Sequence, residues 1–185
     1  YQRYGRVNQD GLGDDILSGN SLAIVGLYKA IYGINPLYNR LYLNPHLPAK
    51  LSGTELLYNF RHEKLKIGLA TDKYSISNGQ FEISSKQNFG FNSGKNELIY
   101  FNGNDDVYSL KALTAETISI EVVKWDVGEY AWLQSSGNEK GKVTYIIKVS
   151  KSDNLYTIYD GNKSIKVKSD KFGVLKFEIK SGNKT

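Results

Sequence analysis

One stretch near the start of the chain, residues 18–58, constrains the fold most, because it combines a helix, a helix stop and the start of a strand. Apolar side chains cover several faces of the segment 21–32, and Lys29 is the one charge inside it. Ser18 or Ser21 can cap its first turn. Gly33 suits the left-handed position after the last turn, and Pro36 prevents continuation. The sequence therefore predicts a helix that ends near residue 32.

A short helix that is apolar nearly all round is one buried among other helices. No second amphipathic helix is visible downstream, so the sequence offers this helix no helical partner. The chain therefore resembles the end of something larger, and its helix is expected to pack on structure that the sequence does not contain.

After Pro36 the pattern changes to segments of period two separated by turns, which is typical of β-strands. The expected strands are 41–43, 54–60, 64–69, 74–77, 80–83, 97–101, 107–110, 117–125, 129–134, 143–151, 155–159, 163–168 and 174–179. Asn78-Gly79 predicts a two-residue hairpin turn and Asp160-Gly161 another tight turn, and residues 92–94 are also expected to form a hairpin turn. The predicted fold class is mainly β: an antiparallel β-sandwich preceded by one buried helix.

Composition excludes several classes of site. The chain has no cysteine, which rules out disulfides, thiolate metal sites and a cysteine nucleophile. No apolar run approaches the roughly 20 residues of a membrane helix, and no targeting segment is visible after Tyr1, which suits a processed or partial polypeptide. Lysines are spread singly along the strand segments, which favours solvated faces over nucleic-acid binding despite a net charge of +5. We expect an extracellular or periplasmic location.

Few residues suggest chemistry. His46 and His62 lack the spacing of metal ligands, so no metal or cofactor is expected. Trp125 and Trp132 lie on expected strands, where a sandwich core explains them more simply than a platform for sugar stacking.

The acidic residues Asp10, Asp14 and Asp15 lie in a glycine-rich loop before the helix. Asp14 and Asp15 can interact with the helix dipole, or one of them can act as a general base. A calcium loop would need oxygen ligands at alternating spacing and a distal glutamate, which this segment lacks. The preceding segment holds arginine and aromatic side chains that suit sugar hydroxyls and ring faces, and equally domain interfaces: Tyr1, Arg3, Tyr4 and Arg6.

Residues 18–69 resemble the junction in inverting glycoside hydrolases and phosphorylases built on an (α/α)6 barrel, which include glucoamylase-like, maltose-phosphorylase-like and cellobiose-phosphorylase-like families. The resemblance rests on Ser18-Gly19-Asn20 at the helix start, on the turn 31–36, and on the segments 39–48 (NRLYLNPHLP) and 58–61 (YNFR). Two positions depart from the family pattern: Asn39-Arg40 stands where Asp-Gly is usual, and His46 stands where Cys is common.

The resemblance implies that the chain is the C-terminal part of a carbohydrate-active enzyme of the inverting glycoside hydrolase class. Residues 1–45 would end the helical barrel, residues 46–115 would form the β-sandwich, and residues 116–185 would continue it or form a second small β module. Asp15 or Asp14 would be the general base, and Arg3, Tyr4, Arg6 and Gln9 would contact substrate.

An inverting mechanism needs two carboxyl groups about 6.5–9.5 Å apart, and the family's general acid lies in a part of the barrel that this chain lacks. The chain is therefore expected to be mainly structural and not catalytic by itself. Its expected partners are an oligosaccharide or glycoside, bound through the barrel, and the rest of the same enzyme, with no nucleic acid and no membrane span.

The alternative is a non-catalytic β-sandwich that binds carbohydrate or mediates adhesion. The helix discriminates between the two hypotheses. A helix that leaves a large apolar face exposed favours the enzyme part, whereas a helix wholly buried against the sandwich favours the free-standing module.

Overall fold

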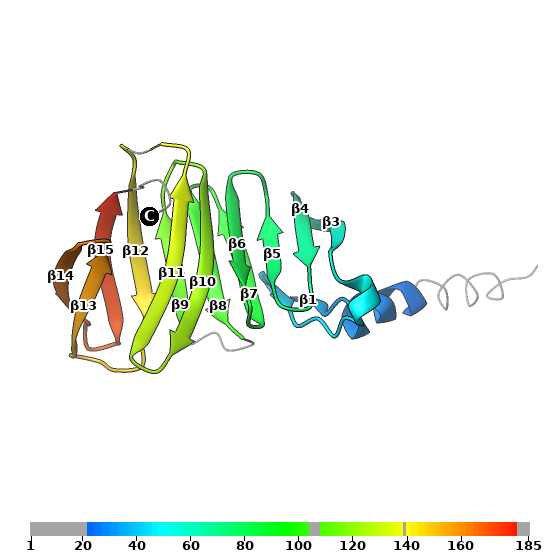
Figure 1. Ribbon diagram of the computed structural model, residues 1–185, viewed down its shortest axis with the longest axis horizontal. Helices are drawn as coiled ribbons and strands as arrows, with labels where there is room; N and C mark the ends of the chain where they lie inside the picture. The colour runs from blue at the N-terminus through cyan, green and yellow to red at the C-terminus, as the bar shows by residue number, and fades with distance from the viewer. Residues whose placement is uncertain (1–21, 104–107, 139, 181–185) are drawn as a thin grey trace, which may run out of the picture.

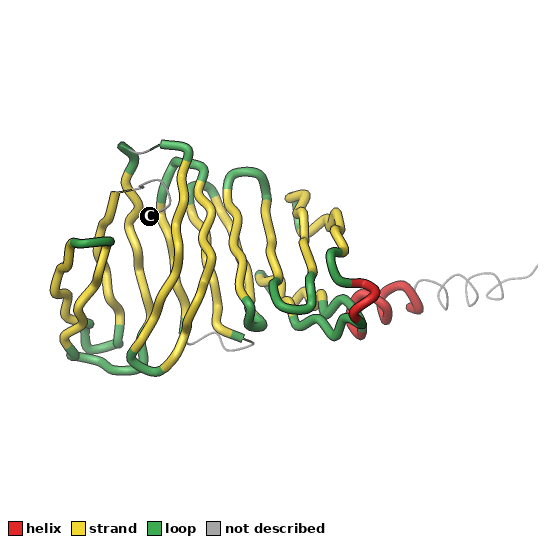
Figure 2. Tube along the Cα trace, viewed as in Figure 1, coloured by secondary structure: helices red, strands yellow, loops and turns green. Residues whose placement is uncertain are grey.

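Strands account for most of the residues that the computed structural model describes, which are 22–103, 108–138 and 140–180. A helix at residues 22–30 precedes them (Figures 1 and 2). Two sheets pack face to face, and a separate two-stranded hairpin lies at the end of the molecule opposite the helix. The predicted fold class, a mainly β sandwich preceded by one helix, is confirmed.

The first sheet has seven strands and the second has six. In spatial order, the first contains β1 (Ile34–Leu37), β2 (Arg40–Leu43), β7 (Phe89–Gly94), β8 (Glu97–Asn102), β9 (Ser109–Leu113), β12 (Lys142–Lys148) and β15 (Val174–Lys180). The second contains β11 (Glu129–Ser136), β10 (Ile118–Asp126), β6 (Phe81–Ser85), β5 (Tyr74–Ser77), β4 (Glu63–Leu69) and β3 (Thr54–Phe60). Strands from both halves of the chain therefore share each sheet.

Alternation along the strands builds one core between the sheets. On the six-stranded sheet, Phe81 and Ile83 of β6 point inward while Glu82 is exposed. On the seven-stranded sheet, Phe91 of β7 is paired with Tyr100 of β8, and both are fully buried. These side chains belong to a single buried cluster that spans both sheets.

The pairing between β6 and β10 is parallel, in a sandwich whose other strand pairs are antiparallel among the described residues. Ile118 pairs with Phe81, and Ile120 pairs with Ile83. A parallel pair requires a long crossover, and here the chain passes through β7, β8 and β9 of the opposite sheet before it returns.

The hairpin of β13 (Leu155–Asp160) and β14 (Lys163–Lys168) lies between β12 and β15 in sequence. Its residues Tyr156, Ile158 and Val167 pack against the sandwich core. The tight turn predicted at Asp160-Gly161 is confirmed, because Asp160 pairs with Lys163 and Gly161 has a φ of 56°.

The helix stop is also confirmed, and the structure shows why glycine is needed there. Gly33 has a φ of 61°, and a Cβ atom at this position would lie 2.0 Å from the carbonyl oxygen of Asn44. The amide of Asn44 donates to the carbonyl of Gly33 at 2.9 Å, and the amide of His46 donates to the carbonyl of Ile31. The chain entering the sandwich is thus held directly against the end of the helix.

Three local predictions need correction. Residues 34–37 form β1, in which Pro36 is tolerated because β1 is an edge strand. Residues 92–94 belong to β7 and not to a turn, since the chain reverses only at Lys95 and Asn96. The connection between β5 and β6 is longer than two residues, because the Asn78 side chain accepts hydrogen bonds from two following amides and widens the turn.

Candidate functional site

The residues that the sequence predicts as a catalytic and substrate-binding site lie outside the described part of the chain. They are Asp14 and Asp15, the candidate general bases, together with Arg3, Tyr4, Arg6 and Gln9. These assignments stay predictions, and Asp10 also lies outside the described residues.

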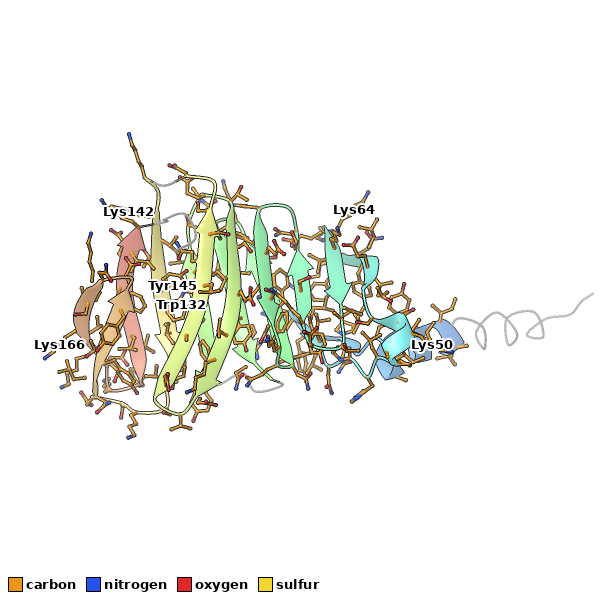
Figure 3. All side chains as sticks on the ribbon, viewed as in Figure 1. Lys50, Lys64, Trp132, Lys142, Tyr145 and Lys166 are labelled. Carbon is orange, nitrogen blue, oxygen red and sulfur yellow. The ribbon has the colours of Figure 1, made fainter. Side chains whose placement is uncertain are left out.

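The two tryptophans lie on strands, as the sequence predicts. His46 and His62 are both exposed, and no group of metal-ligating side chains is found among the described residues. Trp125 lies in the core. Trp132 packs against Tyr145, with ring centroids 5.0 Å apart (Figure 3), and its ring centroid lies 6.4 Å from that of Phe177. Both tryptophans therefore serve the sandwich interior, which confirms the structural interpretation.

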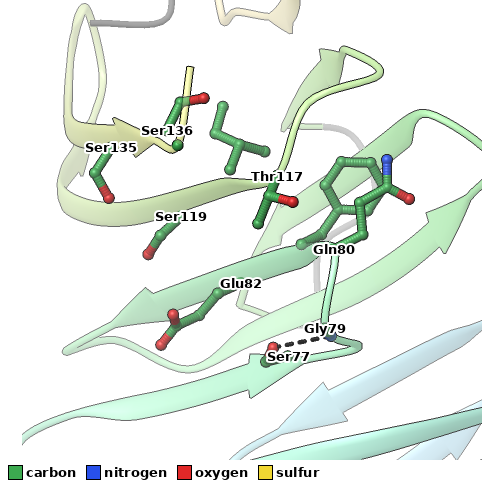
Figure 4. A pocket seen from close by; sticks show the side chains of 11 residues that line it. Ser77, Gly79, Gln80, Glu82, Thr117, Ser119, Ser135 and Ser136 are labelled. Carbon is green, nitrogen blue, oxygen red and sulfur yellow. Dashed lines mark hydrogen bonds between the residues drawn. The ribbon is translucent and has the colours of Figure 1, made fainter. Parts of the chain in front are cut away.

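A polar hollow of about 180 Å³ lies on the outer side of the six-stranded sheet (Figure 4). Its floor is a row of side chains in register across four strands: Ser77 of β5, Glu82 of β6, Ser119 of β10 and Ser135 of β11. Gln80, Thr117 and Ser136 add polar groups at its end. Hydroxyl groups thus flank the carboxylate of Glu82 on both neighbouring strands.

The hollow is suited to hydrogen bonding and not to two-carboxylate catalysis. Glu82 is the one carboxylate among its lining residues, whereas inversion needs a pair. Its hydroxyls and carboxamide can both donate and accept hydrogen bonds, which matches a neutral hydroxylated ligand. In the sequence, the signal for this hollow was the small polar residues at outward positions of β5, β10 and β11. The same pattern is found on any solvated strand face, so it did not predict a hollow.

The helix at 22–30 exposes a large part of its apolar surface. Four aliphatic side chains on it are 42–69% exposed, namely Leu22, Ile24, Val25 and Leu27. The burial expected from its composition is therefore not provided by the described part of this chain. They lie on two sides of the helix, Leu22 with Val25 on one and Ile24 with Leu27 on the other, because residues three apart are neighbours on a helix surface. Together these four side chains are named the aliphatic helix face below.

The helix is attached to the sandwich by its last turn and the residues that follow. Tyr28 lies 5.7 Å from Tyr32 and 6.0 Å from Tyr58 of β3, measured between ring centroids. All three tyrosines pack against the edge of the core. Burial, and secondarily the neighbouring Tyr28, raises the pKa of Tyr58. The helix is thus anchored at one point while its aliphatic face stays in solvent.

Comparison of the chain with protein-family descriptions, curated proteins and solved structures finds no match. The described residues also contain no helix with the length and apolar character needed to cross a membrane.

Proposed function

We propose that the chain is the C-terminal β-sandwich region of a carbohydrate-active enzyme of the inverting glycoside hydrolase class. In this proposal its helix completes a helical domain that carries the catalytic acid. The sandwich covers and supports that domain and does not itself perform catalysis.

The observation that carries the proposal is the aliphatic helix face. Soluble proteins rarely leave several large apolar side chains of one short helix in water, and such exposure marks an interaction site. Fully burying one Val, Leu or Ile side chain contributes about 1.5–3 kcal/mol, so four such residues supply a substantial driving force for docking.

The attachment of the helix supports the same proposal. The contacts of Gly33 with Asn44 and of Tyr28 with Tyr58 fix where the helix leaves the sandwich. A helix held rigidly at its C-terminal end presents its exposed side chains in one orientation, which suits docking on a partner surface of fixed shape.

The experiment that tests the proposal is the mass of the polypeptide that carries this sequence in its native source, measured under denaturing conditions. We expect a mass several times the 20.8 kDa of the chain, with a helical domain preceding residue 22. A native polypeptide of 20.8 kDa would overturn the proposal. Glycosidase turnover by the isolated chain would overturn its structural role.

A second experiment tests the helix contact in that larger polypeptide. Replacing Ile24 and Leu27 together by glutamine should lower its melting temperature and its glycosidase activity, because both side chains would lose apolar burial. Lys29→Gln, also exposed on the same helix, is the matched control and should change neither. Equal behaviour of the double variant and the control would contradict docking through this face.

Carbohydrate binding without catalysis is the second candidate function, and the polar hollow is the observation that favours it. We expect Glu82→Ala to weaken binding of neutral oligosaccharides to the isolated chain. The matched control is Glu55→Ala, since Glu55 is exposed on β3 of the same sheet but outside the hollow. Equal affinities for the two variants, or no binding by the parent chain, would remove this candidate.

A further inference from the structure

The net positive charge of the protein comes entirely from its C-terminal part. Residues 142–185 contain ten lysines and four acidic residues, a balance of +6, whereas residues 1–141 carry 14 basic and 15 acidic residues, a balance of −1. Such an asymmetry along a chain points to an anionic partner for the charged part.

Part of this charge lies on one exposed face of the β13–β14 hairpin. Alternation places Tyr156, Ile158 and Val167 toward the sandwich, and it places the neighbouring positions in solvent. The side chains on the exposed side, named the hairpin face, are Leu155, Thr157, Tyr159, Ser164, Lys166 and Lys168.

The hairpin face combines an aromatic ring with cations. Tyr159 is 77% exposed and pairs directly with Ser164. Lys166 pairs with Thr157, which is the next residue pair on the same face of the hairpin. Diagonal neighbours on a strand pair are about 7–8 Å apart, so Lys166 is within reach of a ligand that covers the Tyr159 ring. Lys166 and Lys168, two residues apart on one strand, are separated by about 6.6 Å along it.

The two lysines are available for an external anion. Lys166 makes no ion pair with any described residue. Lys168 lies 3.4 Å from Asp153, but both side chains are 63% exposed, and an ion pair of that kind is weak.

The base of the hairpin is held rigidly. Ser169, which is buried, donates its hydroxyl to the carbonyl of Lys151 at 2.8 Å and accepts from the amide of Asn154 at 3.0 Å. The carboxylate of Asp170 accepts from the amides of Phe172 and Val174 at the start of β15. The hairpin face is therefore preorganised, which reduces the entropy lost when a ligand binds.

We propose that the hairpin face binds an acidic polysaccharide whose charges are carboxylates. Lys166 and Lys168 neutralise successive carboxylates, the ring of Tyr159 packs on the apolar face of a sugar ring, and the hydroxyls of Thr157 and Ser164 bond to sugar hydroxyls. This site lies at the opposite end of the molecule from the helix (Figure 1).

Two features favour a polysaccharide over a nucleic acid. Residues 142–185 contain no arginine, the residue whose planar fork suits phosphate recognition. The hairpin face also offers one ring, whereas single-stranded nucleic-acid sites stack successive bases on several aromatic side chains. Lysine, a point charge on a flexible stem, suffices for carboxylates.

The test measures binding of sodium polygalacturonate to the protein by titration calorimetry, at low and at high sodium chloride. The variant K166Q/K168Q should bind about tenfold more weakly. The reason is that each exposed lysine beside an anionic surface contributes about 1 kcal/mol or less to the binding free energy. The control K50Q/K64Q removes two exposed lysines near the helix end and should bind like the parent protein (Figure 3). Binding should weaken as salt rises, and Tyr159→Ala should weaken it at every salt concentration.

All substituted side chains are exposed, so each variant should keep the far-ultraviolet circular dichroism and the melting temperature of the parent. Unchanged affinity of K166Q/K168Q or of Tyr159→Ala would overturn the proposal, as would an equal loss in K50Q/K64Q. Dextran, a neutral polysaccharide, should not compete with polygalacturonate. Competition by dextran, or tighter binding of single-stranded DNA through the same two lysines, would also overturn it.

Discussion

Tyr28 and Tyr58 contact each other across the junction between the helix and the sandwich, with ring centroids 6.0 Å apart. Tyr28 belongs to the helix and Tyr58 to β3, so this contact joins the first described element to the edge of the six-stranded sheet. The aliphatic helix face itself lies in solvent. The tyrosine contact and the adjoining chain at Gly33 therefore determine the orientation of the helix relative to the sandwich.

Replacing Tyr28 by alanine should therefore loosen the helix while leaving the sandwich folded. An aromatic pair contributes about 0.5–1.5 kcal/mol beyond its burial. We expect faster hydrogen exchange of the amides of residues 22–32 and unchanged exchange in β4 and β6. Lys29→Ala, on an exposed neighbouring position, is the control and should leave the exchange unchanged. Equal protection in the Tyr28 variant would show that the contact does not hold the helix.

A matched pair of glycine substitutions tests the close approach at the helix end. Gly33→Ala should destabilise the protein by about 1–3 kcal/mol, because alanine at a φ of 61° is strained and its Cβ would meet the Asn44 carbonyl. Gly26→Ala, inside the same helix with open space around it, should instead stabilise the helix by about 0.5–1 kcal/mol. Urea unfolding measures both changes, and a destabilisation shared by the two variants would contradict the account.

The sequence predicted the parts of the fold that depend on local signals. The left-handed glycine at position 33, the strands β3 and β4, and the tight turn after Asp160 follow from turn chemistry and period-two alternation within a few residues. The interior placement of Trp125 followed from its position on an expected strand, for which a sandwich core is the simplest explanation.

Long-range relations were not predictable in the same way. The parallel pairing of β6 with β10 depends on a crossover through three strands of the other sheet, and no local pattern in either strand encodes it. β1 was missed because a proline such as Pro36 usually argues against a strand. In an edge strand, however, the proline is tolerated because no neighbouring strand needs the N–H that it lacks. Residues 92–94 were misassigned because Asn, Ser and Gly are common in turns, whereas here they continue β7.

The functional surfaces were harder still to foresee. The polar hollow arises only when Ser77, Ser119 and Ser135 come into register beside Glu82, and pairing across strands sets that register. The lysines of β14 were correctly assigned to a solvated face, but the sequence alone did not show that Tyr159 shares that face with Lys166.

The base of the β13–β14 hairpin supplies a third prediction. Ser169→Ala should remove the hydrogen bonds that the buried Ser169 hydroxyl makes with the Asn154 amide and the Lys151 carbonyl, at a cost of about 0.5–1.5 kcal/mol for each. The hairpin amides should then exchange faster than those of β12, in a hydrogen-exchange measurement. Ser152→Ala, exposed in the same loop, is the control, and equal exchange in the two variants would refute the anchoring role.

Alkaline pH should destabilise the sandwich through its buried tyrosines. Burial raises the pKa of Tyr100 from 10.0 to about 12, which outweighs the opposing effect of its hydrogen bond with Ser85. A raised folded-state pKa means that the stabilising contribution of the neutral phenol is fully present below pH 10 and is lost as the pH rises from about 10 to about 12. One such group contributes a slope of about 1.4 kcal/mol per pH unit in that window.

Tyr100→Phe isolates this contribution, because phenylalanine keeps the packing on Phe89 and Trp125 but cannot ionise. We expect the free energy of unfolding of the variant to fall less steeply than that of the parent between about pH 10 and 12. Urea unfolding at a series of pH values measures the two slopes. Tyr38→Phe, at a side chain that is 91% exposed, should retain the slope of the parent. A Tyr100→Phe slope equal to that of the parent would mean that Tyr100 does not link alkaline pH to the stability of the core.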